Sequence, residues 1–208
     1  MRSAPPDPIG DPEAQVSVLN AANALTCLRL ALVPVFGYAL LVDHGTSLAA
    51  RWTAFAIFAV ATLTDLADGA VARRRHLVTA FGKIADPLAD KALVGTALVG
   101  LSVLGRLPWW VTGVILVREV GVTALRFWVI RHGVIPASRG GKAKTFLQSL
   151  AIAGLVAPTT GWVLRGVEVL MAVAVVVTVA TGVDYVSKAL ALRAAAATAP
   201  GTASGSQR

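Results

Sequence analysis

The stretch TDLADGAVARRRHLVTAFGKIADPLADK, residues 64–91, places four aspartates between two long apolar segments. Asp65 and Asp68 are three residues apart, and Asp86 and Asp90 are four apart, so each pair falls on one face of a helix. A charge at membrane depth costs about 2.5–3.5 kcal/mol on insertion scales, and four carboxylates also repel one another. Either protons neutralise these side chains or cations hold them.

The composition indicates an integral membrane protein. Of the 208 residues, 56% are hydrophobic and 14% are charged, whereas about a quarter are charged in a soluble domain. Apolar segments of about 20 residues, long enough to cross a bilayer core of about 30 Å, recur along the chain. We expect an all-α integral membrane protein with six transmembrane helices, and a soluble all-α bundle is the alternative. The expected spans are residues 24–43, 48–72, 84–104, 108–130, 146–165 and 168–192.

The two ends of the chain differ from the middle. Residues 1–15 are rich in Pro and Asp, and residues 194–208 are rich in Ala, Thr, Gly and Ser. We expect both to be disordered tails that flank a six-helix catalytic domain over residues 16–193.

The net charge of +8 indicates topology rather than a nucleic-acid partner. The tails and the loops at 73–83 and 131–144 carry 12 Lys and Arg residues, whereas the opposite loops carry three. An even number of spans places both tails on one side, and the positive-inside rule makes that side the cytoplasm. We therefore expect anionic membrane lipid as a partner, no nucleic acid, and an aspartate stretch that opens to the cytoplasm. The Ala-, Val- and Arg-rich composition is compatible with a bacterium, whose plasma membrane is the expected location.

Four carboxylates on adjacent antiparallel helices predict a metal site. An all-oxygen donor set favours Mg²⁺, Mn²⁺ or Ca²⁺ over Zn²⁺, and four carboxylates suit two ions, the usual arrangement for displacement at phosphorus. The alternative is a set of helix-end acids paired with the arginines at 73–75. Gly69, Ala72 and Gly82 leave room for a bulky ligand such as a nucleotide, although ordinary helix packing explains each of them singly.

The spacing Asp65-x2-Asp68-Gly69-x2-Ala72-Arg73-x8-Gly82-x3-Asp86-x3-Asp90 resembles the signature of the CDP-alcohol phosphotransferases and fills each of its positions. Enzymes of this family transfer a phosphatidyl or related group from a CDP-linked donor to an alcohol and release CMP. The resemblance implies a six-helix fold, a homodimer and a polar cavity that opens to the cytoplasm.

The resemblance also implies roles for single residues. Asp65, Asp68 and Asp86 resemble the metal ligands, for two ions of Mg²⁺ or Mn²⁺. Asp90 resembles the general base that takes a proton from the acceptor hydroxyl, and we count it among the metal ligands as well. The expected donor-binding residues are Gly69, Ala72, Gly82, Arg73 beside the diphosphate, and Asn23 and Thr26. For Asn23 and Thr26, helix capping or packing is an equal alternative.

Three further stretches bear on the acceptor: NALTCLR at 23–29, REVGVTALR at 118–126 and GGKAKTFLQ at 140–148. They are similar to bacterial members of the family that use CDP-diacylglycerol and sn-glycerol 3-phosphate to form phosphatidylglycerophosphate. A phosphate monoester dianion needs several cations, and the candidates are Arg118, Arg139, Lys142 and Lys144. A topology signal alone is the alternative for the two lysines.

Other functions stay open at this point. The alternative acceptors are inositol phosphate and phosphatidylglycerol, the second of which would give cardiolipin. From another class, a divalent-cation transporter also places acids on adjacent spans, but with ligands near the midplane and a path to both faces.

Overall fold

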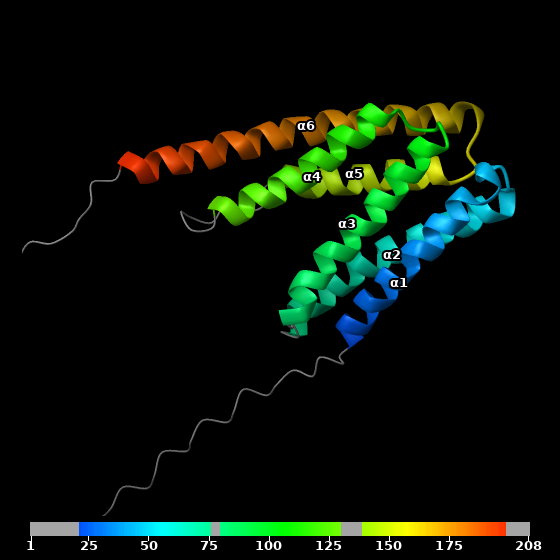
Figure 1. The fold of residues 1–208 in the computed structure, drawn as a ribbon, viewed down its shortest axis with the longest axis horizontal. Helices are drawn as coiled ribbons and strands as arrows, with labels where there is room; N and C mark the ends of the chain where they lie inside the picture. The colour runs from blue at the N-terminus through cyan, green and yellow to red at the C-terminus, as the bar shows by residue number, and fades with distance from the viewer. Residues whose placement is uncertain (1–20, 76–79, 130–138, 199–208) are drawn as a thin grey trace, which may run out of the picture.

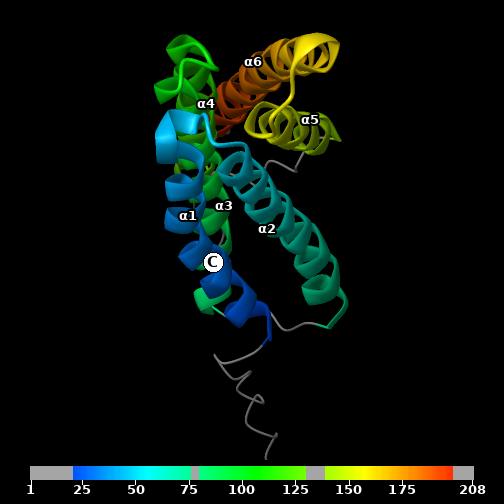
Figure 2. The same ribbon diagram turned by 90° about the vertical axis from the view of Figure 1, so that its right-hand side faces the viewer.

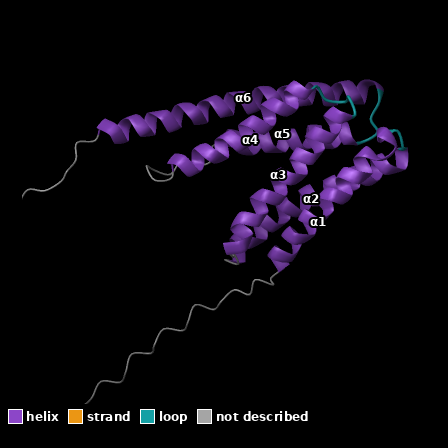
Figure 3. Ribbon diagram, viewed as in Figure 1, coloured by secondary structure: helices purple, strands orange, loops and turns teal. Residues whose placement is uncertain are grey.

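The computed structural model of this chain describes residues 21–75, 80–129 and 139–198 (Figure 1). Within these ranges, all regular secondary structure is helical (Figure 3). The elements are α1 Ala21–Leu41, the 3-10 helix η1 Val42–Gly45, α2 Leu48–Arg75, α3 Ala80–Val103, α4 Trp109–Val129, α5 Arg139–Val156 and α6 Gly161–Thr198. The prediction of an all-α chain with six helices is confirmed.

The six helices form two groups. In one group α1 contacts both α2 and α3, and in the other α6 contacts both α5 and α4. Contacts of α5 with α2 and α3, and of α3 with α4, join the groups. The groups meet at the end that carries the turns at 42–47, 104–108 and 157–160, which we call the turn end (Figure 1). They diverge toward the opposite end, the open end, as the rotated view in Figure 2 also shows.

The hydrophobic core lies toward the turn end. Phe36 of α1 and Phe58 of α2 are fully buried, and their ring centroids are 5.7 Å apart. The other large buried apolar side chains come from α1, α3, α4 and α5: Leu40, Leu98, Leu101, Ile115, Ile152 and Val156. On the same side α5 and α6 pack closely at Gly154, where a Cβ atom would lie 2.6 Å from Cγ2 of Val167. Apolar packing therefore holds the helices together away from the aspartates.

The turn between α1 and α2 depends on three residues with left-handed backbone. Asp43, His44 and Gly45 have φ angles of 51°, 54° and 68°, and Asp and Gly tolerate this conformation better than most residues. Ser47 then caps the start of α2, since its Oγ accepts a hydrogen bond of 3.3 Å from the backbone N–H of Ala50. The two helices are thereby set antiparallel.

The turn between α3 and α4 is a Schellman motif. Gly105 has a φ of 69°, its N–H donates to the carbonyl of Ser102 at 3.0 Å, and the N–H of Arg106 donates to the carbonyl of Leu101 at 2.9 Å. Pro108 follows and precedes the first residue of α4, where its missing N–H costs no helical bond. The predicted boundary between the third and fourth helices is confirmed.

The predicted boundary between the fifth and sixth helices is wrong. The spans 146–165 and 168–192 place the connection at 166–167, whereas α5 ends at Val156 and α6 begins at Gly161. Pro158 follows the end of α5, and Gly161 has a φ of 59°. Hydropathy shows no break in this stretch, but Pro158 removes a helical hydrogen bond and a left-handed residue such as Gly161 cannot lie inside a helix.

Three side chains from outside α5 cap its C-terminal end. Arg51 of α2 donates from Nη2 to the carbonyl of Ala157, and Arg106 donates from Nη1 to the carbonyl of Leu155 at 3.5 Å. The hydroxyl of Thr159 donates to a carbonyl one turn earlier in α5 at 2.9 Å. The last carbonyls of a helix lack intrahelical partners and carry partial negative charge, so cationic donors stabilise this end.

Among the described residues, two segments are long and apolar enough to cross a membrane, Ala24–Gly45 and Gly161–Arg193. Leu48–Thr64 and Lys144–Val156 are shorter apolar helical segments. Charged residues interrupt the apolar sequence of α3 and α4, so hydropathy identifies these two helices less clearly as membrane spans. They include Asp90 and Lys91 in α3, and Arg118 and Glu119 in α4.

The last helix, α6, is longer than predicted. Its 38 residues correspond to about 57 Å, which exceeds a bilayer core of about 30 Å. It continues past the predicted limit at 193 because residues 194–197 are all alanine, which has the highest helix propensity. The predicted tail at 1–15 lies outside the described residues.

Candidate functional site

The four aspartates lie on two consecutive helices at the open end. Asp65 and Asp68 lie in the second half of α2, and Asp86 and Asp90 lie in the first half of α3. The helical spacing places each pair on one face, as predicted. The side chains of Asp65, Asp68 and Asp86 lie outside the described residues, so their role as metal ligands stays a prediction.

The residues expected to bind the donor lie on the first three helices. They are Asn23 and Thr26 in α1, Gly69, Ala72 and Arg73 in α2, and Gly82 in α3. Of these, the structure describes the surroundings of Thr26, whose side chain is buried in the first turns of α1. Arg29, three residues further along, is buried as well. Two polar side chains thus lie inside the bundle near the open end, whereas the surroundings of the other five residues are not among those described.

Asp90 is the predicted base whose surroundings are described. It is half-buried, next to the fully buried Ala89. Its charge interacts with that of Lys144 on α5, and Arg118 and Lys91 also act on this lysine. The predicted base and three cations from three other positions in the sequence therefore share one region.

Glu119 of α4 lies at the centre of these cations. Its Oε1 pairs with Nζ of the buried Lys144 of α5 and with Nη1 of Arg118 at 3.3 Å, and its Oε2 lies 3.7 Å from Nζ of Lys91 of α3. The Glu119 side chain is itself 21% exposed. One carboxylate thereby joins three helices, and we call these four residues the Glu119 cluster.

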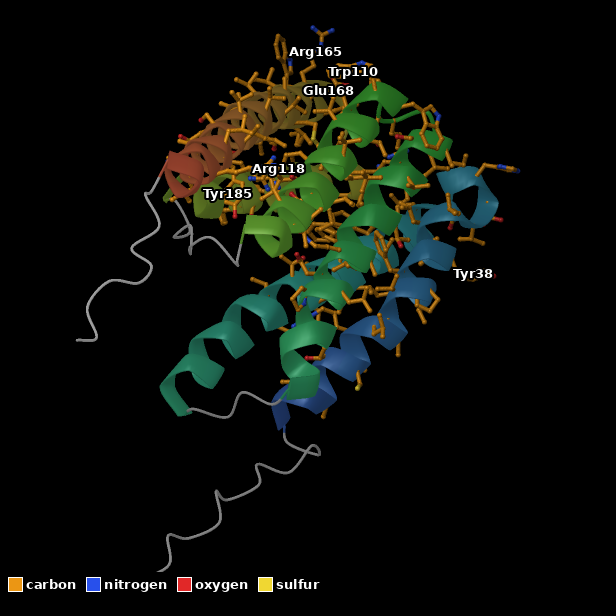
Figure 4. All side chains as sticks on the ribbon, turned by 60° about the vertical axis from the view of Figure 1, so that its left-hand side comes forward. Tyr38, Trp110, Arg118, Arg165, Glu168 and Tyr185 are labelled. Carbon is orange, nitrogen blue, oxygen red and sulfur yellow. The ribbon has the colours of Figure 1, made fainter. Side chains whose placement is uncertain are left out.

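Arg118 connects the Glu119 cluster to α6. Its Nη2 donates to the hydroxyl of Thr181 at 3.3 Å. The next residue of α6, Gly182, leaves space for its stem, since a Cβ atom there would lie 3.2 Å from Cγ of Arg118. In Figure 4 Arg118 lies among the side chains between the helices, toward the same end as Tyr185, whereas Arg165 lies at the opposite end of α6.

Of the four residues expected to bind the acceptor phosphate, the structure brings two together. Arg118 and Lys144 both contact Glu119, although they come from different helices. Arg139 and Lys142 lie in the first turn of α5, on the same helix as Lys144, and their side chains lie outside the described residues. Their role stays a prediction.

Sequence reasoning missed Glu119 and Lys91 as members of the site. Both are charged residues in otherwise apolar segments, and such residues are expensive unless they are paired. The free-energy cost of a charge in an apolar segment is the signal that could have identified them. The spacing within one helix does not show which residue of another helix each charge contacts.

The donor set at the open end suits a hard divalent cation. Asp65, Asp68, Asp86 and Asp90 supply carboxylate oxygens from α2 and α3, two helices that contact each other. Mg²⁺ and Mn²⁺ prefer such ligands, and no thiol or imidazole is needed. That these four residues hold the metal stays a prediction.

Comparison with known proteins agrees with this arrangement. The family model described as CDP-alcohol phosphatidyltransferase matches residues 19–180, which include all four aspartates and the Glu119 cluster. The chain belongs to the CDP-alcohol phosphatidyltransferase family. Members of this family are membrane-embedded transferases of phospholipid biosynthesis, and they are typically metal-dependent.

Several relatives in this family are similar over most of their length. A probable phosphatidylglycerophosphate synthase of Mycobacterium tuberculosis is 54% identical over 181 residues, which is 87% of each chain. A CDP-diacylglycerol–glycerol-3-phosphate 3-phosphatidyltransferase of Bacillus subtilis is 38% identical over 184 residues, covering 82% of this chain and 95% of the relative. The enzyme of the same name from Escherichia coli is 38% identical over 181 residues, covering 83% of this chain and 96% of the relative.

Proposed function

We propose that this chain transfers the phosphatidyl group of CDP-diacylglycerol to sn-glycerol 3-phosphate, which forms phosphatidylglycerophosphate and releases CMP. The observation that carries the proposal is the 54% identity, over 87% of both chains, to a probable phosphatidylglycerophosphate synthase. The match extends through α4 and α5, which carry the residues expected to bind the acceptor, as well as through the aspartates.

The cations around Glu119 support an anionic acceptor. Arg118, Lys144 and Lys91 come within ion-pair distance of one carboxylate, so three cationic donors converge at this place. A phosphate monoester is a dianion near neutral pH and binds best where several cationic donors converge. An uncharged alcohol gains nothing from such a cluster.

The reaction is a displacement at phosphorus. A hydroxyl oxygen of glycerol 3-phosphate forms a bond to the phosphorus that bears the diacylglycerol, and the bond from that phosphorus to the oxygen of CMP breaks. Asp90 takes the proton of the attacking hydroxyl, as a carboxylate within hydrogen-bond reach of it does. CMP leaves with the bonding electrons on its phosphate oxygen.

Charge develops on the diphosphate as CMP leaves. Arg73 would stabilise this charge, because it follows Asp65 and Asp68 on the same helix. Two ions of Mg²⁺ or Mn²⁺ would supply further positive charge to the diphosphate oxygens. The residues that would hold these ions are Asp65, Asp68, Asp86 and Asp90. Gly69, Ala72 and Gly82 leave room for the nucleotide beside the backbone.

We also propose that all six helices cross the bacterial plasma membrane, with the open end and both tails in the cytoplasm. The positive-inside bias supports this orientation. At the turn end, the exposed tryptophans fit an interfacial belt on the other side of the membrane: Trp52, Trp109, Trp110 and Trp162. A homodimer, as in the family it resembles, belongs to the same proposal, and light scattering of the detergent-solubilised protein tests it.

The test of the function is CMP release by the purified protein in detergent with CDP-diacylglycerol and Mg²⁺ or Mn²⁺. Parallel reactions receive glycerol 3-phosphate, inositol phosphate or phosphatidylglycerol. We expect metal-dependent CMP release with glycerol 3-phosphate and much slower release with the other two.

Two outcomes would contradict the proposal in different ways. Release with inositol phosphate or phosphatidylglycerol instead keeps the family chemistry but changes the acceptor. No release with any acceptor, together with Mg²⁺ uptake by sealed proteoliposomes, would identify a divalent-cation transporter.

A further inference from the structure

The arrangement of charges around Glu119 is more specific than a cationic patch. A single carboxylate on α4 contacts Lys91 from α3 and Lys144 from α5, and its neighbour Arg118 bonds Thr181 of α6. Three helices therefore meet at one acid, and Arg118 links a fourth, α6, to it.

Burial makes Lys144 depend on this acid. Its side chain is 2% exposed, so water does not solvate its ammonium group. An ammonium buried in this way is stable only with a partner of opposite charge, and removal of that partner leaves an uncompensated buried charge. Without Glu119, Lys144 loses this ion pair, and Asp90 is the other carboxylate that acts on it.

The Glu119 cluster also carries more cations than carboxylates. Lys91, Arg118 and Lys144 surround one carboxylate, and Asp90 acts on Lys144 as a second one. The phosphate of the acceptor can accept hydrogen bonds from all three cations. Lys91, whose side chain is 35% exposed, leaves one side of the cluster accessible.

We propose that Glu119 is a positioning residue that holds Lys91, Arg118 and Lys144 in place to receive the phosphate of the acceptor. When the phosphate binds, these cations share their hydrogen bonds between it and Glu119, and the acceptor hydroxyl is directed toward Asp90. This inference rests on the proposed function, and it adds Lys91 and Glu119 to the residues that determine the choice of acceptor.

The test compares Glu119→Gln with a matched control, Asp184→Asn. Both substitutions turn a carboxylate into an amide and break an ion pair, since Asp184 pairs with Lys188 at 2.7 Å on the exposed surface of α6. The measurements are the KM values for glycerol 3-phosphate and for CDP-diacylglycerol, and kcat, all from CMP release in detergent.

For Glu119→Gln we expect the KM for glycerol 3-phosphate to rise at least about tenfold, since hydrogen bonds between charged groups are lost. The KM for CDP-diacylglycerol should stay within about twofold, and Asp184→Asn should change neither value. A merely structural role of Glu119 would reduce the amount of active enzyme and so lower kcat, with both KM values unchanged. That result, or an equal rise of both KM values, would overturn the inference.

Two further variants keep the test decisive if Glu119→Gln does not fold. Glu119→Asp keeps the charge but shortens the side chain, and it should raise the acceptor KM by a smaller factor. Lys91→Met removes the most exposed cation of the cluster and leaves the buried pair intact, so it should fold and still raise the acceptor KM severalfold. An unchanged acceptor KM in Lys91→Met and in Glu119→Asp would overturn the inference.

The wild-type enzyme separates this inference from the proposed function. If it releases no CMP with glycerol 3-phosphate, the proposed function fails. If it does, and Glu119→Gln leaves the acceptor KM within about twofold, the positioning role fails alone.

Discussion

Gly182→Ala is a small change that tests the place of Arg118 in the acceptor site. A Cβ atom at this position would lie 3.2 Å from Cγ of Arg118, which is closer than ordinary carbon contacts of about 3.5–4.0 Å. Arg118 must therefore move by a few tenths of an ångström. Its hydrogen bonds to Glu119 and Thr181 are both 3.3 Å long, so we expect a shift of this size to weaken them.

The size of the effect follows from these contacts. A hydrogen bond to a charged group contributes about 1.5–3 kcal/mol, and each 1.4 kcal/mol is a factor of ten in affinity. If Arg118 binds the acceptor phosphate, its displacement should raise the KM for glycerol 3-phosphate about tenfold or more. The KM for CDP-diacylglycerol should change little.

Gly166→Ala on the same helix is the matched control. A Cβ atom at Gly166 meets nothing within 4 Å, so this variant reports the effect of the substitution on helix propensity alone, about 0.5–1 kcal/mol in favour of alanine. CMP release in detergent gives the KM values, and thermal unfolding gives the stability of both variants. Equal acceptor KM values for Gly182→Ala and Gly166→Ala would refute the reasoning, because Arg118 would then not contact the acceptor.

Three further outcomes are expected. Asp90→Asn should lower the rate of CMP release at least about a hundredfold, which is the effect of losing a general base. Calorimetry should still detect binding of the donor. An Asp90→Asn variant with the wild-type rate of CMP release would exclude this role. Arg51→Ala should destabilise the protein by about 1–3 kcal/mol, because a carbonyl at the end of α5 loses its donor. Substitution of the exposed Arg165 by alanine should not destabilise it. Thermal unfolding in detergent measures both variants, and equal melting temperatures would contradict the capping role of Arg51. Gly154→Ala should destabilise the protein by about 1–3 kcal/mol through overpacking between α5 and α6. Gly113→Ala, where a Cβ meets nothing within 4 Å, should be neutral or stabilising. If Gly154→Ala proved the more stable of the two variants, α6 would have moved to make room for the added methyl group.

The fold separates stability from chemistry along the length of the helices. The fully buried apolar side chains, such as Phe36, Phe58 and Ile152, lie toward the turn end, where three turns hold the helices together. The aspartates and the Glu119 cluster lie toward the open end, where the two groups of helices diverge. Charged side chains can meet there without disrupting the apolar packing that holds the bundle together.

Patterns within single helices were predictable from the sequence. The spacing of Asp65, Asp68, Asp86 and Asp90 indicated two helices that each carry two acids on one face, and the structure has both helices. Helix ends were predictable where glycine and proline mark them, as at Gly105. The end of α5 was predicted wrongly because the prediction relied on hydropathy, and apolar residues lie on both sides of Pro158.

The sequence by itself determined the all-helical class and the family, and it predicts the chemistry of the four aspartates, because these depend on residue type and on spacing within one or two neighbouring helices. Only the tertiary structure decided that Lys91, Glu119 and Lys144 meet, since they lie on three helices whose relative positions no local pattern encodes. The packing of α3, α4 and α5 at the turn end sets those positions. The pairing of a buried lysine with Glu119 then follows from the cost of leaving its charge without a partner.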